Sequence, residues 1–309
     1  MSKILTVFGA TGGQGGSVID HILAHPQLAK TYQIRAITRD VTKAAALGLK
    51  EKGVEVVSAD LNDKESVAKT VEGSSIVFGV TNFWETANKD IEVKQGRNIV
   101  DAAKKANVER LIFSSLVNVT KETNGRITSV KHFDGKAEIE EYARSVGVPG
   151  TYFMPSVFDI FFLGFFRKNA NGEYALGLPF EGTVRIPLID IGSDAGLFVA
   201  AILLQLPETL NKRVVASGGY VTPDEAVATF TEVTGRKAVY NNPGWDLWSS
   251  FLPPKAKEEM TGNWQLIYNP GYYAGEPENA IDEGHALVAK AGLRKPHSWK
   301  EFVAVNFKE

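Results

Sequence analysis

The sequence predicts an α/β protein: a Rossmann-type, doubly wound parallel β-sheet followed by a smaller C-terminal α+β lobe. Strand-like and helix-like segments alternate through the first half of the chain, and a glycine-rich loop directly follows the first strand-like segment. Such alternation is typical of a parallel sheet whose crossover helices cover both faces. The alternation stops near Pro155, which marks the start of the lobe.

The strand-like segments are short apolar runs bounded by glycine or polar residues. They are Ile4–Phe8, Gln33–Thr38, Glu55–Ala59, Ser75–Val80, Arg110–Ser114 and Gly150–Met154. The helices expected between them cover about Gly15–Ala24, Thr42–Lys52, Lys64–Val71, Asn88–Ala106 and Phe133–Ser145. Asn62, with Glu65 three residues later, resembles a capping box and predicts the start of the third helix. Right-handed crossovers then place a ligand crevice at the carboxyl ends of the strands.

The second half of the chain is irregular and rich in glycine, proline and aromatic residues. Helices are expected there at Asp194–Leu206, Pro223–Thr234 and His297–Phe307. We therefore expect an NADP-binding Rossmann domain over residues 1–155 and a smaller substrate or partner lobe over residues 156–309. The lobe should cover the carboxyl edge of the sheet and be partly interleaved with it through a strand or two. The most apolar run, Phe158–Phe166, is interpreted as core, because a membrane span needs roughly 18 apolar residues.

Composition excludes several classes of function. The 309 residues carry a net charge of −2, which argues against direct nucleic-acid binding, since phosphate backbones select basic surfaces. The absence of cysteine removes disulfides, thiolate nucleophiles and cysteine-ligated zinc, and no metal site is expected. The first strand begins too early to leave room for a targeting signal, so we expect a cytoplasmic protein, with the nucleus as a second compartment.

The loop from Gly9 to Gly15 has the spacing GxxGxxG, which short-chain and extended dehydrogenases use. Gly9 permits the tight turn, Gly12 lets the backbone approach a pyrophosphate, and Gly15 lets helix and strand pack closely. The first turn of the following helix offers free N–H groups and a positive dipole end to phosphates. We expect this loop, with Thr11 and Gln14, to bind a dinucleotide; a tight structural turn is the alternative.

The ends of the second and third strands indicate which dinucleotide is bound. Arg39, with Lys43 one turn further along the chain, can hold a 2′-phosphate, which favours NADP(H) over NAD(H). Asp40 leaves two alternatives open, because it could accept the ribose hydroxyl or pair with Arg39. Asp60 and Leu61 suit an adenine pocket, although Asp60 could equally belong to a helix-capping turn.

These residues resemble the NmrA-like family of atypical short-chain dehydrogenases/reductases, which includes a redox-sensor protein. The resemblance covers nearly the whole chain. It rests on Gly9–Gly16, Thr38-Arg39, Thr81–Glu85, Gln95–Asn98 and His132–Lys136.

The resemblance implies that NADP(H) lies in the crevice, with Lys136 near the nicotinamide ribose and the segment Pro155–Phe158 beside the nicotinamide. The residues that it assigns to the cofactor are Thr81, Asn82, Phe83, Lys136, Pro155, Val157 and Phe158. Two alternatives remain open for the same segments. Phe83 and Trp84 could be core aromatics, and Gln95 and Asn98 could form a polar helix face.

The catalytic pattern Tyr-x-x-x-Lys of short-chain dehydrogenases lacks its tyrosine here, because His132 and Lys136 occupy the two positions. A spacing of four residues puts both side chains on one helix face. One hypothesis is an NADPH-dependent reductase of a small carbonyl, imine or enone-type substrate. In it, His132 or Lys136 supplies the proton, and Ser114 or Ser115 orients the carbonyl.

The alternative hypothesis is a non-catalytic redox sensor. Lys136 then only anchors the ribose, His132 is a structural residue at the helix start, and the cofactor state selects a regulatory partner such as a transcription factor. A third possibility is a protein that holds the cofactor without using it. The aromatic residues of the lobe suit either a substrate pocket or a partner surface. They are Trp245, Trp248, Phe251, Trp264, Tyr268, Tyr272 and Tyr273.

Overall fold

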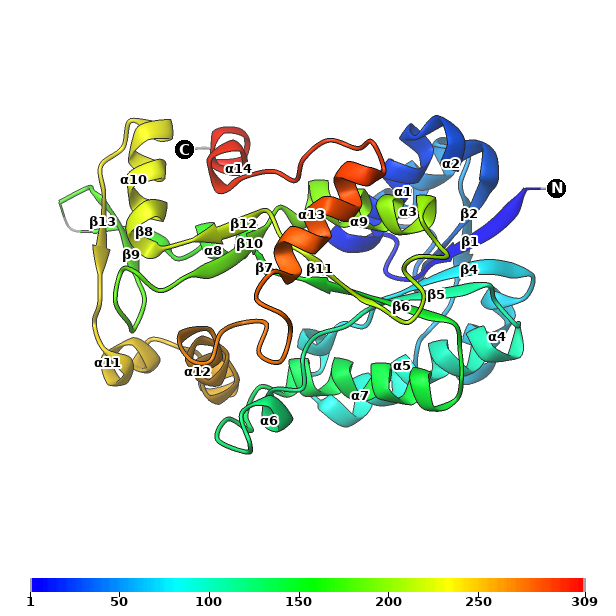
Figure 1. The fold of residues 1–309 in the computed structure, drawn as a ribbon, viewed down its shortest axis with the longest axis horizontal. Helices are drawn as coiled ribbons and strands as arrows, with labels where there is room; N and C mark the ends of the chain where they lie inside the picture. Colours follow the sequence, from blue (N-terminus) through cyan, green and yellow to red (C-terminus); the bar gives the residue numbers. More distant parts are fainter. Residues whose placement is uncertain (1, 170, 308–309) are drawn as a thin grey trace.

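The computed structural model describes residues 2–169 and 171–307. A seven-stranded parallel sheet of order β11-β6-β5-β4-β1-β2-β3 forms its centre (Figure 1). The strands are β1 (Lys3–Val7), β2 (Tyr32–Thr38), β3 (Glu55–Ser58), β4 (Ser74–Gly79), β5 (Arg110–Ser114), β6 (Gly150–Pro155) and β11 (Arg213–Ala216). The order of the strands reverses between β1 and β4, which is where doubly wound sheets bind ligands. The expected fold class is confirmed.

Helices cover both faces of this sheet (Figure 1). One face carries α1 (Gly13–Ala24), α2 (Pro26–Thr31), α9 (Ile191–Leu204) and α13 (Ala280–Lys290). The opposite face carries α4 (Lys64–Val71), α5 (Lys89–Lys105) and α7 (Lys131–Ser145). The short helices α3 (Ala44–Glu51) and α6 (Val119–Glu122) follow β2 and β5. Each face therefore has its own apolar core, to which the inner strands contribute alternating side chains.

Side-chain caps fix the starts of several helices. Asp63, rather than Asn62, caps α4: its carboxylate accepts hydrogen bonds from the backbone N–H groups of Glu65 and Ser66. The expected cap at Asn62 is therefore wrong by one residue, because the Asn62 side chain donates to Asp60 instead. Helix α10 (Pro223–Thr234) starts with a capping box and ends at a glycine, so its boundaries agree with the sequence prediction.

The second half of the chain returns to the sheet through a close helix contact. Strand β11 adds parallel to β6 at the sheet edge, and α9 packs along α1. At the crossing, the Gly196 N–H donates to Ser17 Oγ over 2.9 Å. A Cβ atom on Gly196 would lie 2.0 Å from the Ser17 carbonyl oxygen, so only glycine allows the two helices to approach this closely.

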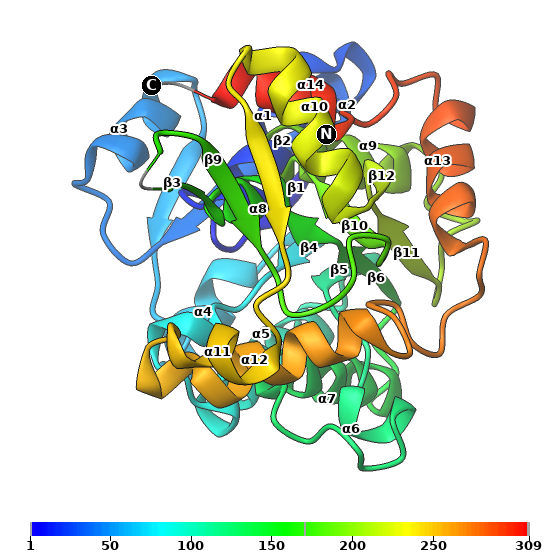
Figure 2. The same ribbon diagram turned by 90° about the vertical axis from the view of Figure 1, so that its left-hand side faces the viewer.

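Two small sheets and five helices form the lobe, which faces the viewer in Figure 2. One sheet contains β7 (Val157–Phe158), β10 (Ile186–Ile189) and β12 (Gly219–Val221), and the other contains β8 (Phe166–Lys168), β9 (Tyr174–Gly177) and β13 (Ala238–Asn241). The helices are α8 (Asp159–Leu163), α10, α11 (Trp245–Ser250), α12 (Pro254–Tyr268) and α14 (Trp299–Asn306). In Figure 2 the strands run between α10 and α14 on one side and α11 and α12 on the other.

Many aromatic rings pack in the core of the lobe. Phe166 stacks on Phe230 with ring centroids 4.6 Å apart, and Trp264 is fully buried. The expectation that Phe158–Phe166 is core holds only in part, because Ile160 is 57% and Phe161 is 46% exposed. The segment folds into the short helix α8 and can bury only one of its sides. Within the described residues, no helix has the length and apolar character needed to cross a membrane.

A buried acid sits where α8 meets α9. The side-chain oxygens of Asp159 have no hydrogen-bond partner in the described chain, and the residue is 1% exposed. Burial, together with the charges of Asp190 and Asp194, raises the pKa of Asp159 to about 8. Asp190 contacts His297 Nδ1 at 3.0 Å, and Asp194 accepts the His297 N–H over 2.8 Å. Asp159 is thus the carboxyl of this group that lacks a compensating donor.

Replacing Asp159 by asparagine should therefore stabilise the protein, and more so as the pH rises. The unfolded carboxyl ionises near pH 4, whereas the folded one keeps its proton until about pH 8. Between these values the folded state binds more protons, so wild-type stability falls with rising pH by up to about 1.4 kcal/mol per unit from this group. Urea unfolding of wild type and Asp159→Asn at pH 5 and pH 8 measures the difference in their free energies of unfolding. An equal difference at both pH values would contradict the raised pKa of Asp159.

Candidate functional site

The glycine loop between β1 and α1 has the geometry that its spacing predicts. Gly9 has a φ of +63°, and a Cβ atom on Gly15 would lie 2.3 Å from the Gly9 carbonyl oxygen. Gly12 precedes the helix, and neither a side-chain cap nor an acidic residue occupies the first turn of α1. The N–H groups of that turn are therefore available to an anion, with the positive end of the helix dipole behind them.

Arg39 lies at the carboxyl end of β2 with its side chain 63% exposed, and it forms an ion pair with Glu85. The pairing of Arg39 with Asp40 that the sequence left open does not form. Asp40 accepts hydrogen bonds from the side chain and backbone of Thr42, which lower its pKa. Lys43 precedes α3 and lies on the same exposed segment. An exposed guanidinium is therefore free to exchange one anionic partner for another.

The loop after β3 is held by two buried side chains of α5. Gln95 donates to the Asn62 side chain over 3.1 Å, and Asn98 donates to the Leu61 carbonyl over 2.8 Å. Gln95 and Asn98 thus form a buried polar face of α5 that contacts this loop. Asp60 is exposed, and its carboxylate accepts from Asn62 in a turn that precedes α4. The hydrogen bonds of Gln95 and Asn98 tie the loop to α5.

A cavity of about 260 Å³ opens at the carboxyl edge of the sheet, under the lobe. Nine of the residues that we expected to bind the cofactor or to supply the proton line it, and so does Ser114; the nine are Gln14, Thr81, Asn82, Phe83, His132, Lys136, Pro155, Val157 and Phe158. Eight others lie outside the lining: Gly9, Thr11, Gly12, Gly15, Arg39, Lys43, Asp60 and Leu61. The wall is mostly apolar and aromatic, as is usual for small-molecule sites.

The structure adds lining residues that the sequence gave no reason to select. They are Leu116, Phe161, Met260 and Asn263, and they join Tyr272, one of the lobe aromatics expected to suit a pocket, and Phe133 of the His132–Lys136 stretch. Met260 and Asn263 project from α12, and Tyr272 follows that helix, so a segment more than 100 positions after Lys136 closes the cavity. Asn263 is buried, and its side-chain oxygen has no hydrogen-bond partner among the described residues. A buried amide without partners is costly, so this group is available to a ligand.

Lys136 is held by a buried network at the bottom of the cavity. Its Nζ donates to the Thr81 carbonyl at 3.0 Å, to Thr81 Oγ1 at 2.9 Å and to Glu92 Oε1 at 2.8 Å. The Glu92 side chain is 1% exposed, and Thr81 Oγ1 also donates to it. An ammonium has three donors, so all three are engaged. Lys136 is a fixed, paired cation that can approach a ligand only by exchanging one of these contacts.

His132 lies in the first turn of α7 and pairs with Glu259 of α12. Glu259 Oε1 accepts the backbone N–H of His132 over 2.9 Å and also contacts Nδ1 of the imidazole. The ring packs against Phe83 and Trp84, with centroid distances of 5.8 and 5.2 Å. Phe83 is buried, whereas Trp84 is 49% exposed, so Trp84 forms a wall of the cavity rather than part of the core.

The other hydroxyl groups near the cavity differ in their availability. Ser114 Oγ is buried in the cavity wall without a partner in the described chain. Ser115 points away and donates to Glu140 over 2.6 Å. The hydroxyl of Tyr272 donates to the Pro155 carbonyl, and burial raises the pKa of Tyr272 well above its usual value. Of these groups, Ser114 alone remains free to orient a bound carbonyl.

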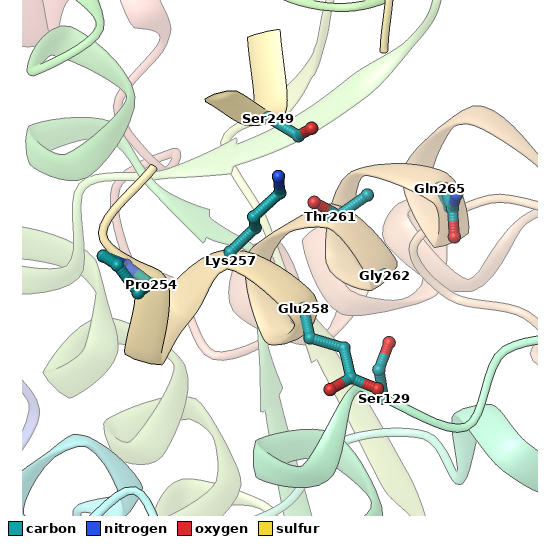
Figure 3. Close-up of a pocket in the computed structure, with 8 residues that line it drawn as sticks. All are labelled: Ser129, Ser249, Pro254, Lys257, Glu258, Thr261, Gly262 and Gln265. Carbon is teal, nitrogen blue, oxygen red and sulfur yellow. The ribbon is translucent and has the colours of Figure 1, made fainter. Parts of the chain in front are cut away.

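The opposite side of α12 lines a second, open groove of about 400 Å³ (Figure 3). Lys257 points toward Ser249, and Glu258 points toward Ser129. Lys257 and Glu258 are exposed. Among the lobe aromatics, Trp248, Trp264 and the pair Tyr272-Tyr273 are buried, while Phe251 is 74% and Tyr268 is 47% exposed.

The chain is similar in sequence to the members of one known protein family. The model of the NmrA-like family matches residues 1–303. The NmrA-like family domain-containing oxidoreductase malD of Malbranchea aurantiaca is 32% identical over 308 residues, which cover 94% of this chain and 91% of that protein.

Two solved structures resemble the fold. The negative transcriptional regulator NmrA in complex with NADP superposes with a TM-score of 0.80 and 20% identity, covering 99% of this chain and 95% of that one. The Citrobacter sp. triphenylmethane reductase complexed with NADP(H) gives a TM-score of 0.73 and 25% identity, covering 93% and 99%.

The tight packing of the glycine loop gives a direct test. Gly15→Ala should destabilise the protein by about 1–3 kcal/mol, the usual cost of overpacking, because the new Cβ atom would meet backbone atoms of Gly9 and Ala10. Gly16→Ala is the matched control, since its Cβ atom would lie 3.6 Å from the Ala10 oxygen, an ordinary contact. Urea unfolding of both variants measures the difference, and equal stability of the two would refute the packing role.

Proposed function

The chain belongs to the NmrA-like family, and on that premise we propose that it binds NADP(H) and reduces a small carbonyl, imine or enone-type substrate. The observation that carries the proposal is one continuous edge of the sheet. It joins the uncapped first turn of α1 to a cavity that holds His132, Lys136 and the free Ser114 hydroxyl. Supporting it, malD is named an oxidoreductase and the triphenylmethane reductase is complexed with NADP(H).

In this proposal the cofactor follows the carboxyl edge of residues 1–155. The first turn of α1 binds the pyrophosphate, Arg39 and Lys43 bind the 2′-phosphate, and the loop at Asp60 and Leu61 borders the adenine. The residues proposed at the nicotinamide half are Thr81, Asn82, Phe83, Lys136, Pro155, Val157 and Phe158. Residues 156–309 are the proposed substrate lobe, since α8 and α12 supply the outer wall of the cavity.

The fit of a 2′-phosphate depends on the pair between Arg39 and Glu85. Both side chains are exposed, at 63% and 41%, and exposed ion pairs contribute about 0–1 kcal/mol. A hydrogen bond from a guanidinium to a charged group can contribute roughly 1.5–3 kcal/mol. It is therefore favourable for Arg39 to exchange Glu85 for the 2′-phosphate. Competition from Glu85 only reduces the preference for NADP(H) over NAD(H).

NADPH, when bound, supplies a hydride to the substrate carbon, and a side chain must supply the accompanying proton to the oxygen or nitrogen. Lys136 uses all three of its N–H groups in the network with Thr81 and Glu92, which suits a ribose anchor. The imidazole of His132 forms a hydrogen bond through Nδ1 alone in the described chain. We therefore assign the proton to His132 Nε2, with Ser114 and Asn263 orienting the substrate.

A second candidate function is a redox sensor without catalysis, in which NADP(H) controls binding to a regulatory protein. NmrA, which has this fold, is a negative transcriptional regulator and was solved with NADP. The fully engaged Lys136 also suits a purely structural anchor. Exposed apolar side chains of the lobe, Leu247, Phe251 and Tyr268, would then offer a contact surface. Direct nucleic-acid or membrane binding is not part of either proposal.

Cofactor preference tests the first half of the proposal. We expect NADP⁺ to bind about 10- to 150-fold more tightly than NAD⁺, the equivalent of 1.5–3 kcal/mol. Arg39→Ala should remove most of this preference and leave NAD⁺ affinity nearly unchanged. Glu85→Gln should instead raise NADP⁺ affinity by up to about fivefold, because the competing carboxylate is lost. Calorimetric titration measures all three proteins. Equal affinity of wild type for both cofactors would show that Arg39 does not bind the phosphate.

Turnover tests the second half. Purified protein is assayed for NADPH oxidation with aldehydes, quinones, imines and enones. His132→Phe should then cut kcat by about 10²–10⁴-fold, the usual contribution of a positioned acid, with little change in cofactor affinity. Lys136→Met alone would leave Glu92 as an unpaired buried charge, which costs about 3–5 kcal/mol, so it is combined with Glu92→Gln. This double variant should mainly weaken NADPH binding.

The same measurements separate the two candidate functions. A reductase shows turnover that depends on His132. A sensor binds NADP(H) without turning over any of the four substrate classes, and its His132→Phe variant loses little beyond some stability. If a substrate is found and His132→Phe reduces it at the wild-type rate, the assignment of the proton to His132 is wrong.

A further inference from the structure

An acid–imidazole pair joins two helices that are far apart in the sequence. His132 lies on α7 and Glu259 on α12, and their side chains are 13% and 10% exposed. One oxygen of Glu259 contacts both Nδ1 and the backbone N–H of His132. The imidazole is therefore held at two points by one carboxylate, beside the aromatic wall formed by Phe83 and Trp84.

The chemistry of this contact fixes where the ring proton sits. An ionised carboxylate accepts hydrogen bonds and cannot donate them, so Nδ1 must carry a proton to face Glu259. Nε2 lies on the opposite edge of the imidazole and makes no hydrogen bond within the described residues. Because the ring lines the cavity, Nε2 is the nitrogen left for a ligand. Which nitrogen of a histidine reacts is generally set by the bond that the other one makes.

We infer that Glu259 is a positioning residue, which holds the proton of neutral His132 on Nδ1 and so reserves Nε2 for the cavity. The inference rests on the proposed reductase only for its catalytic consequence. In each turnover Nε2 of the imidazolium would give its proton to the substrate oxygen or nitrogen, bound NADPH would supply the hydride to the carbon and become NADP⁺, and His132 would be left as the Nδ1–H form. A proton from solvent then restores the imidazolium.

A purely structural role for Glu259 is the alternative. No side chain of the preceding residue caps α7, and Glu259 accepts the N–H of His132 in its first turn. Such a cap is typically worth about 1 kcal/mol and would be lost with the side chain. A cap alone has no influence on which ring nitrogen carries the proton. The tautomer of His132 therefore distinguishes the two roles, whereas stability does not.

The test is long-range ¹H–¹⁵N NMR of the histidine rings. The spectra are recorded on the full-length protein at a pH high enough for the His132 ring to be neutral. The chain contains five histidines, and loss of one set of signals in His132→Gln identifies the ring. Wild type should show the Nδ1–H form. Glu259→Ala should move His132 toward the mixture of Nδ1–H and Nε2–H tautomers that an unconstrained imidazole shows. Glu259→Gln, whose amide oxygen can still accept a hydrogen bond, should keep the Nδ1–H form.

Glu258→Ala is the matched control, because Glu258 is the neighbouring carboxylate of α12 and faces the outer groove (Figure 3). It should leave the His132 signals unchanged. An Nε2–H form in wild type, or an unchanged tautomer in a folded Glu259→Ala, would overturn the inference. If Glu259→Ala does not fold, the wild-type tautomer and the Glu259→Gln spectrum decide.

The catalytic consequence has its own readout. With a substrate from the NADPH screen, Glu259→Ala should lower kcat by about 10²-fold, the lower end for a positioned acid, and change KM little. Glu259→Gln should recover part of the loss, and Glu258→Ala should match wild type. Absence of turnover in wild type with an intact Nδ1–H form counts against the proposed reductase and still supports the positioning of the ring. Turnover that survives in Glu259→Ala overturns the catalytic consequence.

Discussion

The close approach of α9 to α1 is the constraint on which the rest of the architecture depends. Gly196 sits against the Ser17 backbone with no room for a Cβ atom, and its N–H is bound by the Ser17 hydroxyl. This contact brings the second half of the chain back to the sheet, where β11 pairs with β6. Because β7 and α8 directly follow β6, the lobe must then lie over the carboxyl edge. The cavity exists because these two halves meet there.

The polar groups of the cavity divide into those that the fold neutralises and those that it leaves free. Lys136 and Glu92 form a buried ion pair in which Thr81 also bonds Glu92 Oε1, while Glu92 Oε2 has no hydrogen-bond partner in the described chain. Ser114 and Asn263 have unpartnered oxygens in the described chain. In an otherwise apolar wall these are the groups that a ligand would have to match, since an unmatched polar group there is costly.

Helix α12 makes this division possible because its two sides have different surroundings. Glu259 and Asn263, four residues apart, lie on the side that faces the cavity and α7, as i, i+4 spacing requires. Lys257 and Glu258 line the open groove on the other side. One helix of the lobe thus supplies both the partner of His132 and an outer wall of the site. The position of the lobe therefore determines whether the His132 imidazole keeps its contact with Glu259.

Periodicity and glycine spacing were enough to predict six strands of the sheet, the main helices between them and the loop between Gly9 and Gly15, because these features depend on neighbours within a few residues. The bounds of Lys64–Val71, Arg110–Ser114 and Pro223–Thr234 agree with the structure for that reason. The partners of the functional side chains were decided only by tertiary contacts. Glu259 lies 127 residues from His132, and Glu85 lies 46 residues from Arg39. Nothing local to a histidine or an arginine shows which carboxylate the folded chain will bring to it.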